Sequence, residues 1–424
     1  MNSYEELIKH MNHGMLAADD DRVALLKKIL AKIGHPDQRY KVVHLAGTNG
    51  KGSTGSLISQ LLTNAGNKVG HFASPALHDL KEQITINQQV ISEADFIQVY
   101  DWIEQRLPDE IVAADLTIFE WFVLVMLQWF ANQHVDWAVI EAGLGGRDDA
   151  TNAISAPLLT VFTHIDLDHT KILGNTIKKI AYNKSQIIKR DTTVFIAPNQ
   201  HADTIEVLKR TAVKNQACEV NEASQIKIKI NSQSIGGSDL IVDSSYLKHV
   251  SVTLKMIGEF QVDNFKTVVS IYDWLLSHDF VSTSQALIDA ALQVSIPGRM
   301  QVLQTNPVVI LDGAHNPDAA QQLLNSLSDL FFDKHLIFVI GFLKDKNYQI
   351  MARQYEAVAD HIFVVTPDNE RRALSAKQIQ QTLPQSQVVA TVQQGVNAAL
   401  KIAGIQSVIV VTGSFYVVKE LTNR

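Results

Sequence analysis

The chain has 424 residues, of which 46% are hydrophobic and 19% are charged, as in an ordinary globular protein. This length suits two domains rather than a single core. The formal net charge of −7 argues against nucleic acid or an anionic membrane surface as the main partner.

The ends and the apolar runs of the chain predict a cytoplasmic protein. The first six residues lack the basic and apolar regions of a signal peptide, and no long uncharged apolar run suggests a membrane span. A single cysteine, Cys218, excludes an internal disulfide and a cysteine-based metal cluster.

Short β-branched runs alternate with longer helical patterns, which is typical of parallel sheets covered by helices, so we expect an α/β fold. The expected strands are residues 40–45, 69–72, 137–140, 158–162, 193–196, 308–311, 336–340, 361–365 and 407–411. The expected helices are residues 21–33, 53–64, 118–133, 180–189, 262–276, 317–326 and 393–402.

Two further patterns divide the chain. Residues 225–254 alternate as β-structure around Gly236-Gly237 and predict a small antiparallel insert. Residues 294–299 break the helical pattern before a new unit that begins with a strand. We therefore expect residues 1–295 to form a P-loop ATPase-type domain with a mainly parallel sheet, and residues 296–424 to form a Rossmann-like α/β domain.

The segment between the strand at 40–45 and the next helix is rich in glycine and contains one lysine, Lys51. Such a turn lets backbone N–H groups and a helix N-terminus face phosphates, which predicts ATP binding. Ser53 or Thr54 could reach a phosphate-bound Mg²⁺. The loop is a variant, because Gly52 follows the lysine where Ser or Thr is usual. A tight strand-to-helix connection without a ligand is the alternative interpretation.

Polar side chains follow several of the expected strands. Glu141 lies at a carboxyl end, where ligands of open α/β sheets bind, and a carboxylate there can hold Mg²⁺. Ser74 can either add an oxygen ligand or cap a turn. His169, taken alone, favours a structural role, because Mg²⁺ does not prefer nitrogen.

Lys184 lies in a helical stretch whose apolar spacing would bring it near the sheet edge. Burial near metal or phosphate would make it a reactive amine, whereas a surface lysine is the alternative. In the second half, the turns at 312–317 and 412–414 each follow a strand, which suggests a cleft that faces the first domain.

Together these motifs resemble the folylpolyglutamate synthase and dihydrofolate synthase group of the Mur-ligase-like ATP-dependent amide-forming enzymes. The matching motifs occur in the expected order across nearly the whole chain, at residues 47–53, 116–120, 141–152, 168–169, 173–176, 261–264, 297–299, 311–317, 341, 345–346 and 412–414.

The resemblance implies a role for each matching residue. The ATP phosphates would be cradled by Gly47, Thr48, Asn49, Gly50, Lys51, Gly52 and Ser53, and the ATP site completed by Asn264, Arg299 and Asp312. Two Mg²⁺ ions would be held by Ser53, Ser74, Glu141, His169 and a carbamylated Lys184, with Lys51, Glu141, His169 and Lys184 as the catalytic set. The folate or pterin pocket would contain Thr117, Phe119, Asp148, Asp149 and Ala150, and glutamate would meet His315 and Ser414.

The implied reaction adds L-glutamate to the γ-carboxylate of a reduced folate through an acyl phosphate, in a monomeric enzyme. A dihydropteroate-specific or bifunctional enzyme is the alternative, and a non-catalytic paralogue that binds ATP or folate is the alternative of another class. The phosphate loop begins after only about 45 residues, too few for the extra N-terminal domain of the cell-wall Mur ligases. The chain departs from the family pattern at Gln83, Asp148, Ser185-Gln186, Phe260 and Ile296, and Asp148 bears most directly on the acceptor.

Overall fold

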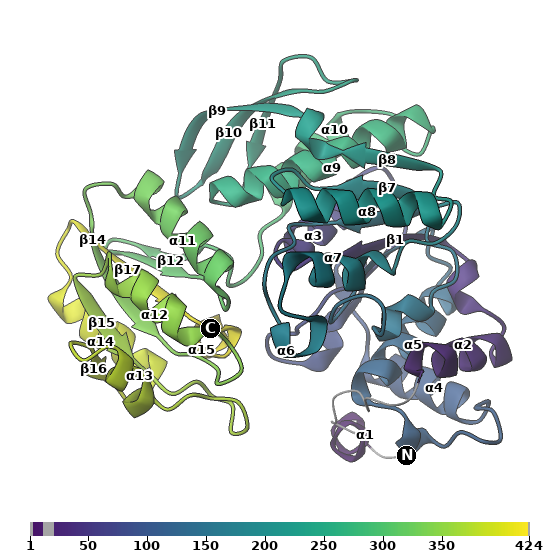
Figure 1. Cartoon of the computed structure of the whole chain (residues 1–424), viewed down its shortest axis with the longest axis horizontal. Helices are drawn as coiled ribbons and strands as arrows, with labels where there is room; N and C mark the ends of the chain where they lie inside the picture. The colour runs from purple at the N-terminus through teal and green to yellow at the C-terminus, as the bar shows by residue number, and fades with distance from the viewer. Residues whose placement is uncertain (1–2, 12–20, 423–424) are drawn as a thin grey trace.

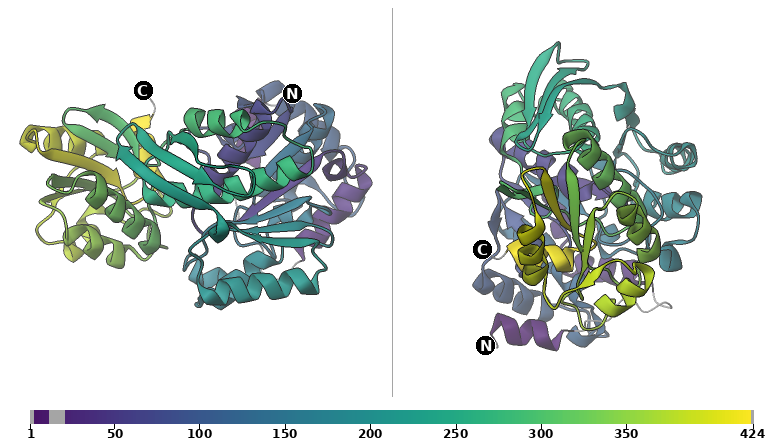
Figure 2. Two further views of the ribbon diagram at one scale, coloured as in Figure 1. Left: turned by 90° about the horizontal axis from the view of Figure 1, so that it is seen from above. Right: turned by 90° about the vertical axis from the view of Figure 1, so that its left-hand side faces the viewer.

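The computed structural model describes residues 3–11 and 21–422. Figures 1 and 2 show a larger part built from residues up to α10 and a smaller part built from the residues that follow, lying side by side. The larger part contains an eight-stranded sheet. In order across the sheet, its strands are β4 (Gln89–Val90), β3 (Ile84–Ile86), β2 (Val69–Phe72), β5 (Trp137–Glu141), β1 (Lys41–Ala46), β6 (Leu159–Phe162), β7 (Thr193–Ile196) and β8 (Glu219–Glu222).

Neighbouring strands are parallel along the part of the sheet made of β2, β5, β1, β6, β7 and β8. The strands β3 and β4 add an antiparallel edge next to β2. The central strands are buried on both sides because helices cover both faces of the sheet. One face packs on α3 (Lys51–Asn64), α9 (Glu259–Ser277) and α10 (Gln285–Gln293). The other packs on α2 (Arg22–Lys32), α4 (Glu93–Glu104), α5 (Ile118–Asn132), α7 (Ile177–Ser185) and α8 (Ala202–Lys214).

The shorter helices α1 (Tyr4–His10) and α6 (Thr170–Leu173) complete the larger part. Tyr4 of α1 packs edge-on against Phe96 of α4 with ring centroids 5.2 Å apart. None of the helices in the described residues is both long and apolar enough to cross a membrane.

The predicted antiparallel insert is confirmed. It is a three-stranded sheet of β9 (Lys227–Ser234), β10 (Gly237–Asp243) and β11 (Val250–Leu254), drawn at the top of Figure 1. Gly237 has a φ of +130°, and a Cβ there would lie 2.4 Å from the carbonyl oxygen of Leu254. The turn therefore requires glycine at this position.

The smaller part contains a six-stranded sheet that is parallel except for its first strand. Its order is β12 (Gln301–Thr305), β13 (Val308–Leu311), β17 (Ser407–Thr412), β14 (His335–Ile340), β15 (His361–Val364) and β16 (Gln387–Val388). One face is covered by α11 (Pro317–Leu330), α12 (Tyr348–Glu356) and α13 (Ala376–Thr382), and the other by α14 (Val392–Ile402) and α15 (Phe415–Thr422).

The α/β class with a mainly parallel first sheet is confirmed, and each expected strand forms with ends shifted by at most one residue. The helix expected at 180–189 is displaced: α7 ends at Ser185, because Gln186 and Ile188 turn back in i→i+3 hydrogen bonds and Ile187 and Ile188 enter the core. The expected boundary at 295/296 lies between the end of α10 and the start of β12, and the division into two domains there stays a prediction.

Candidate active site

The loop between β1 and α3 is held tightly by distant parts of the chain. A Cβ at Gly47 would lie 1.8 Å from Thr163 Oγ1, and one at Gly50, whose φ is +89°, would lie 2.3 Å from Asn264 Oδ1. Both positions therefore exclude a side chain. The backbone N–H groups of Thr48 and Asn49 donate to the carbonyl of His164, at 2.8 and 3.1 Å. These two N–H groups are therefore not free for an anion, whereas those of the first turn of α3 are free to face one.

Two lysine side chains meet beneath this loop. Lys51 Nζ donates to the Gly47 carbonyl at 2.9 Å, and Lys184 Nζ donates to the same carbonyl at 2.7 Å. Burial, and then the charge of Lys51, lower the pKa of Lys184 to about 7. Burial also lowers the pKa of Lys51. Lys184 therefore has a neutral amine available near neutral pH, as a nucleophilic lysine requires.

Glu141 ends β5 as a buried carboxylate that is open to a ligand. Neither of its oxygens has a hydrogen-bond partner among the described residues. The imidazole of His71 in β2 lies beside it, with Nε2 3.5 Å from Glu141 Oε1. A Cβ at Gly55 would lie 3.0 Å from the same oxygen, so glycine lets α3 approach the carboxylate closely. A buried acceptor without donors beside Ser53, itself buried in the first turn of α3, fits a hard divalent cation.

His169 starts α6 with a φ of +48°. Burial lowers its pKa to about 4, so the ring is neutral and has a lone pair. Its Nε2 lies 3.3 Å from Lys346 Nζ of the smaller part, which also donates to Asp168 Oδ1 at 2.7 Å. Although burial opposes its charge, His315 and Lys346 hold the pKa of Asp168 well below its usual range. A neutral imidazole is compatible with metal binding as well as with a structural role.

A cavity of about 270 Å³ opens beside the phosphate loop and is lined by both parts of the chain. Asn264 and Arg299 contribute to it, and the Arg299 guanidinium lies 4.5 Å from the centre of the Phe415 ring. Asp312 also lines it, but both of its oxygens accept backbone N–H groups, from Met300 at 2.9 Å and from Ala314 at 2.8 Å. Asp312 thus holds the segment that carries Arg299.

The two residues considered for glutamate lie at neighbouring strand ends, since β13 pairs with β17. His315 Nδ1 contacts the Gly313 carbonyl at 3.0 Å, and its Nε2 lies 3.6 Å from Asp168 Oδ2. Ser414 Oγ is buried and has no hydrogen-bond partner in the part of the chain that the structure describes. Such a hydroxyl can receive a polar ligand.

Some of the residues predicted for the folate pocket already make local hydrogen bonds. Thr117 caps α5 through Glu120, and Asp149 accepts from Leu144 N at 2.7 Å and from the Thr151 N and Oγ1 at 3.0 and 2.6 Å. Both are occupied by local capping. The Phe119 ring lies over Gly143, where a Cβ would be 2.5 Å away.

The remaining predicted residues are Ala150 and Asp148 for the folate pocket and Ser74 for Mg²⁺. Ala150 is buried at the start of a short 3-10 helix, Ala150–Ala153. Asp148 is exposed and pairs with Arg147 at 3.1 Å. Ser74, half-buried, follows β2 in a bend.

Several residues of the site are not among those singled out from the sequence. His71 lies against Glu141, and Asp318 accepts from Asn49 Nδ2 at 2.7 Å. Asn316 also exchanges a hydrogen bond with Asn49, at 3.1 Å. Asn316-Pro317 is a recognisable helix start, with Asp318 in its first turn. A histidine inside an apolar strand gives no comparable signal.

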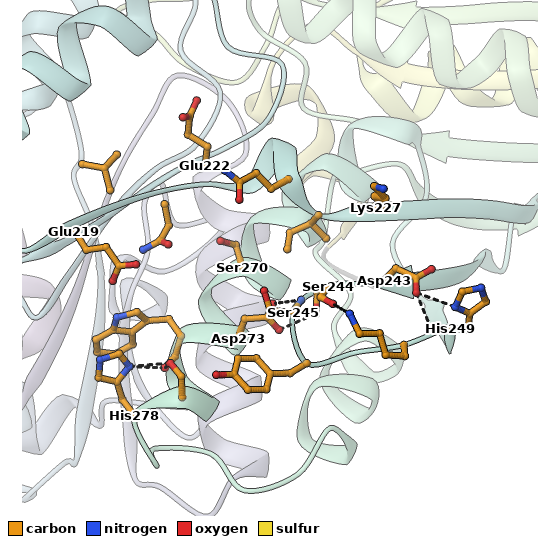
Figure 3. A pocket seen from close by; sticks show the side chains of 18 residues that line it. Glu219, Glu222, Lys227, Asp243, Ser244, Ser245, His249, Ser270, Asp273 and His278 are labelled. Atoms are coloured by element: carbon orange, nitrogen blue, oxygen red, sulfur yellow. Dashed lines mark hydrogen bonds and ion pairs between the residues drawn. The ribbon is translucent and has the colours of Figure 1, made fainter.

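A larger cavity, about 750 Å³, lies elsewhere, between β8, the antiparallel insert and α9. Figure 3 shows its polar side chains, of which Asp273 accepts from Ser244 Oγ at 2.8 Å and from Ser245 N at 3.0 Å. None of the residues discussed above lines it. Size therefore does not identify the active site here, whereas the unpartnered carboxylate and the phosphate loop do.

Comparison with known proteins agrees with this geometry. Residues 112–271 match the Mur ligase middle domain, and residues 298–415 match the Mur ligase glutamate ligase domain. The dihydrofolate synthase/folylpolyglutamate synthase of Bacillus subtilis (strain 168) is 30% identical over 408 residues, 94% of each chain. The chain belongs to the folylpolyglutamate synthase/dihydrofolate synthase family.

Solved structures of this family have the same fold. The Mycobacterium tuberculosis folylpolyglutamate synthase complexed with ADP has a TM-score of 0.87 at 26% identity, covering 99% of this chain and 97% of that one. A bifunctional folylpolyglutamate synthase/dihydrofolate synthase with Mn, AMPPNP and L-glutamate bound has a TM-score of 0.83 at 26% identity, with coverage of 99% and 97%. The family assignment therefore holds along the whole chain and not for one domain only.

Proposed function

We propose that this protein is an ADP-forming ligase that uses ATP to join L-glutamate to the γ-carboxylate of a reduced folate. The observation that carries the proposal is the buried, unpartnered Glu141 carboxylate beside a glycine loop that holds Lys51. That combination suits a nucleotide phosphate group with its divalent ion. The relatives bound to ADP, AMPPNP and glutamate support the same ligands here.

The reaction divides into two displacements. The folate carboxylate attacks the γ-phosphorus of ATP and ADP leaves, which gives an acyl phosphate. The glutamate amine then attacks the acyl carbon and inorganic phosphate leaves. Lys51, Arg299 and the N-terminal turn of α3 would offset charge on the phosphoryl group, so the protein contributes mainly position and electrostatic stabilisation.

Ser53, Ser74, Glu141 and His169 would hold Mg²⁺, which supplies charge neutralisation on the phosphates. We further propose that Lys184 is carbamylated. Its amine is buried and has a pKa of about 7, so it can react with CO₂, and the resulting carbamate would offer an anionic oxygen for a second Mg²⁺. Without the modification, a lysine at this position would repel a cation.

The Asp168–Lys346 contact would help to close the smaller part over the phosphate loop. Both side chains are buried, so the contact excludes water from the region where an acyl phosphate would form. Asn49 with Asn316 and Asp318 forms a second link between the same two parts.

Dihydropteroate is a second candidate acceptor. The Bacillus subtilis relative, which matches nearly its whole length, carries both synthase names. Phe119, Ala150 and Asp148 are the residues that would face a pterin. Asp148 would act through its carboxylate once Arg147 is displaced or shared. Cytoplasmic location and a monomeric state stay predictions from the sequence.

The test is incubation with MgATP and radiolabelled glutamate, with a reduced folate and dihydropteroate offered separately. Label on the folate alone supports polyglutamation, and label on both supports dual activity. ADP formation that needs both acceptor and glutamate excludes a silent paralogue. If neither acceptor became labelled while ATP still bound, the result would contradict the proposed reaction.

A further inference from the structure

Next to the phosphate loop, three potential metal ligands converge. His164 and Asp166 lie in the loop after β6, and His201 is the residue before α8. One ligand atom from each of the three side chains lies within 4.8 Å of the other two. His201 Nε2 is 3.3 Å from Asp166 Oδ2, and His164 Nε2 is 3.7 Å from the same oxygen.

The backbone around this cluster is held in place. Gln200 Nε2 donates to the Thr163 carbonyl at 2.9 Å, and Gln200 Oε1 accepts from Ile165 N at 3.1 Å. Thr48 Oγ1 donates to the Asp166 carbonyl at 2.9 Å. The segments that carry the three ligands are thus cross-linked to each other and to the phosphate loop, so their backbone positions are fixed relative to one another.

One ring nitrogen of His164 is left without a hydrogen bond. Its Nε2 is buried and makes no hydrogen bond within the described residues. The nearest oxygens, on Asp166 and on Asp318 of α11, are 3.7 and 3.5 Å away. The surroundings therefore attract a cation to this nitrogen.

We propose that His164, Asp166 and His201 form a site for a transition-metal ion of the zinc class, distinct from the Mg²⁺ site at Glu141. Two imidazoles and a carboxylate suit Zn²⁺ or Co²⁺ better than Mg²⁺, which prefers oxygen. Ligand atoms around tetrahedral zinc are about 3.3 Å apart for bonds of about 2.0 Å, so small side-chain shifts would suffice.

The proposed site lies where the larger and smaller parts of the chain meet. Asp318 belongs to the smaller part, and both His164 and Asp318 line the 270 Å³ cavity. Asp318 Oδ2 is 3.5 Å from His164 Nε2, so an ion bound by the three ligands would lie close to the smaller part at the edge of that cavity.

Co²⁺ is the probe, because its visible absorption reports coordination. The purified full chain is titrated with Co²⁺ while excess Mg²⁺ competes at Glu141, and Zn²⁺ binding is measured by calorimetry under the same conditions. His201→Ala and Asp166→Asn remove ligands. His249→Ala is the matched control, since His249 also pairs with an aspartate, Asp243, at 2.9 Å but on the insert.

We expect one Co²⁺ with the visible bands of a four- or five-coordinate ion, and a loss of affinity of about 10-fold or more in both ligand variants but not in His249→Ala. His201 is half exposed at a helix start, so its replacement should leave the fold intact. Equal binding by wild type and His201→Ala would overturn the proposal. So would Co²⁺ bands that disappear only in Glu141→Gln. These readouts measure binding, so they stay separate from success or failure of the ligase assay.

Discussion

Lys346 donates a 2.7 Å hydrogen bond to the Asp168 carboxylate, and the pair connects the six-stranded sheet to the eight-stranded one. Both side chains are buried. A buried charge that loses its partner is costly, because neither water nor another group replaces the lost contact.

Lys346→Met should therefore weaken the closed arrangement. Truncating one partner of a buried charge pair costs about 2–5 kcal/mol. We expect a fall in kcat/KM for glutamate of about 10-fold or more, because closing would no longer be favoured. Lys344→Met is the control, since Lys344 is exposed two residues earlier. Steady-state kinetics of both variants would test this, and equal kcat/KM values would show that the pair does not support closure.

Glu141→Gln should separate stability from activity. The amide replaces a buried carboxylate whose oxygens accept no hydrogen bond and whose nearest ring nitrogen, on His71, is 3.5 Å away, so the metal-free variant should be more stable by about 1–3 kcal/mol. Ligase activity should fall by about 100-fold or more, because the Mg²⁺ ligand is lost. Urea unfolding with EDTA and ADP release with MgATP measure the two effects, with exposed Glu356→Gln as the control. A variant that keeps its Mg²⁺ dependence and full rate would refute the assignment.

Lys184 should respond to CO₂ and pH. Burial lowers its pKa from 10.5 to about 7, so the reactive neutral amine forms as pH rises through 7. Protein kept at pH 6 without CO₂ should lose activity and regain it with bicarbonate at pH 8. A carbamate signal in ¹³C NMR after ¹³CO₂ labelling should be present in wild type and absent in Lys184→Ala.

Short carboxylic acids should restore part of the activity of Lys184→Ala, since they can occupy the place of the carbamate. Lys178→Met, on the exposed side of the same helix, is the control and should keep the signal. Unlabelled wild-type protein with full activity would show that the lysine works unmodified.

His164 should make stability depend on pH. Its pKa is raised from 6.5 to about 9 in the folded protein, so the stabilising contribution is complete below pH 6.5 and is lost as pH rises through 9. In EDTA, the free energy of unfolding should fall between pH 6.5 and 9 in the wild type. In His164→Gln this fall should be smaller by about 1 kcal/mol, after allowance for solvent screening. Chemical denaturation at several pH values measures it. His335→Gln, which removes an exposed histidine 3.1 Å from Asp360, should leave the slope unchanged.

The strands and the phosphate loop could be predicted because their signals are local. A β-branched run such as 193–196 reads as a strand without knowledge of its neighbours, and it forms at those residues. The glycines at 47 and 50 predicted a turn that only glycine fits, and Thr163 and Asn264 supply the physical reason. The extent of α7 was less well predicted, because Ile187 and Ile188 suit both a helix and a buried turn.

The family motifs predicted that Lys51, Glu141 and Lys184 belong to one site. They did not predict the protonation state or the hydrogen-bond partners of these side chains. The pKa of Lys184 depends on burial and on Lys51, residues far apart in sequence. The Glu141 carboxylate accepts no hydrogen bond among the described residues because the surrounding chain brings no donor within reach of its oxygens. The use of the Thr48 and Asn49 N–H groups by His164 removes two donors that the loop sequence alone assigns to phosphate.

The amino-acid sequence by itself determined the α/β class, the order of strands and helices, the glycine loop and the family, because these depend on local periodicity and on motifs read in order. Only the tertiary structure decided that Lys346 reaches Asp168, that His71 lies against Glu141, and that His164, Asp166 and His201 converge. Such contacts join segments that are remote along the chain, and their geometry and desolvation arise only when the sheets and helices pack together.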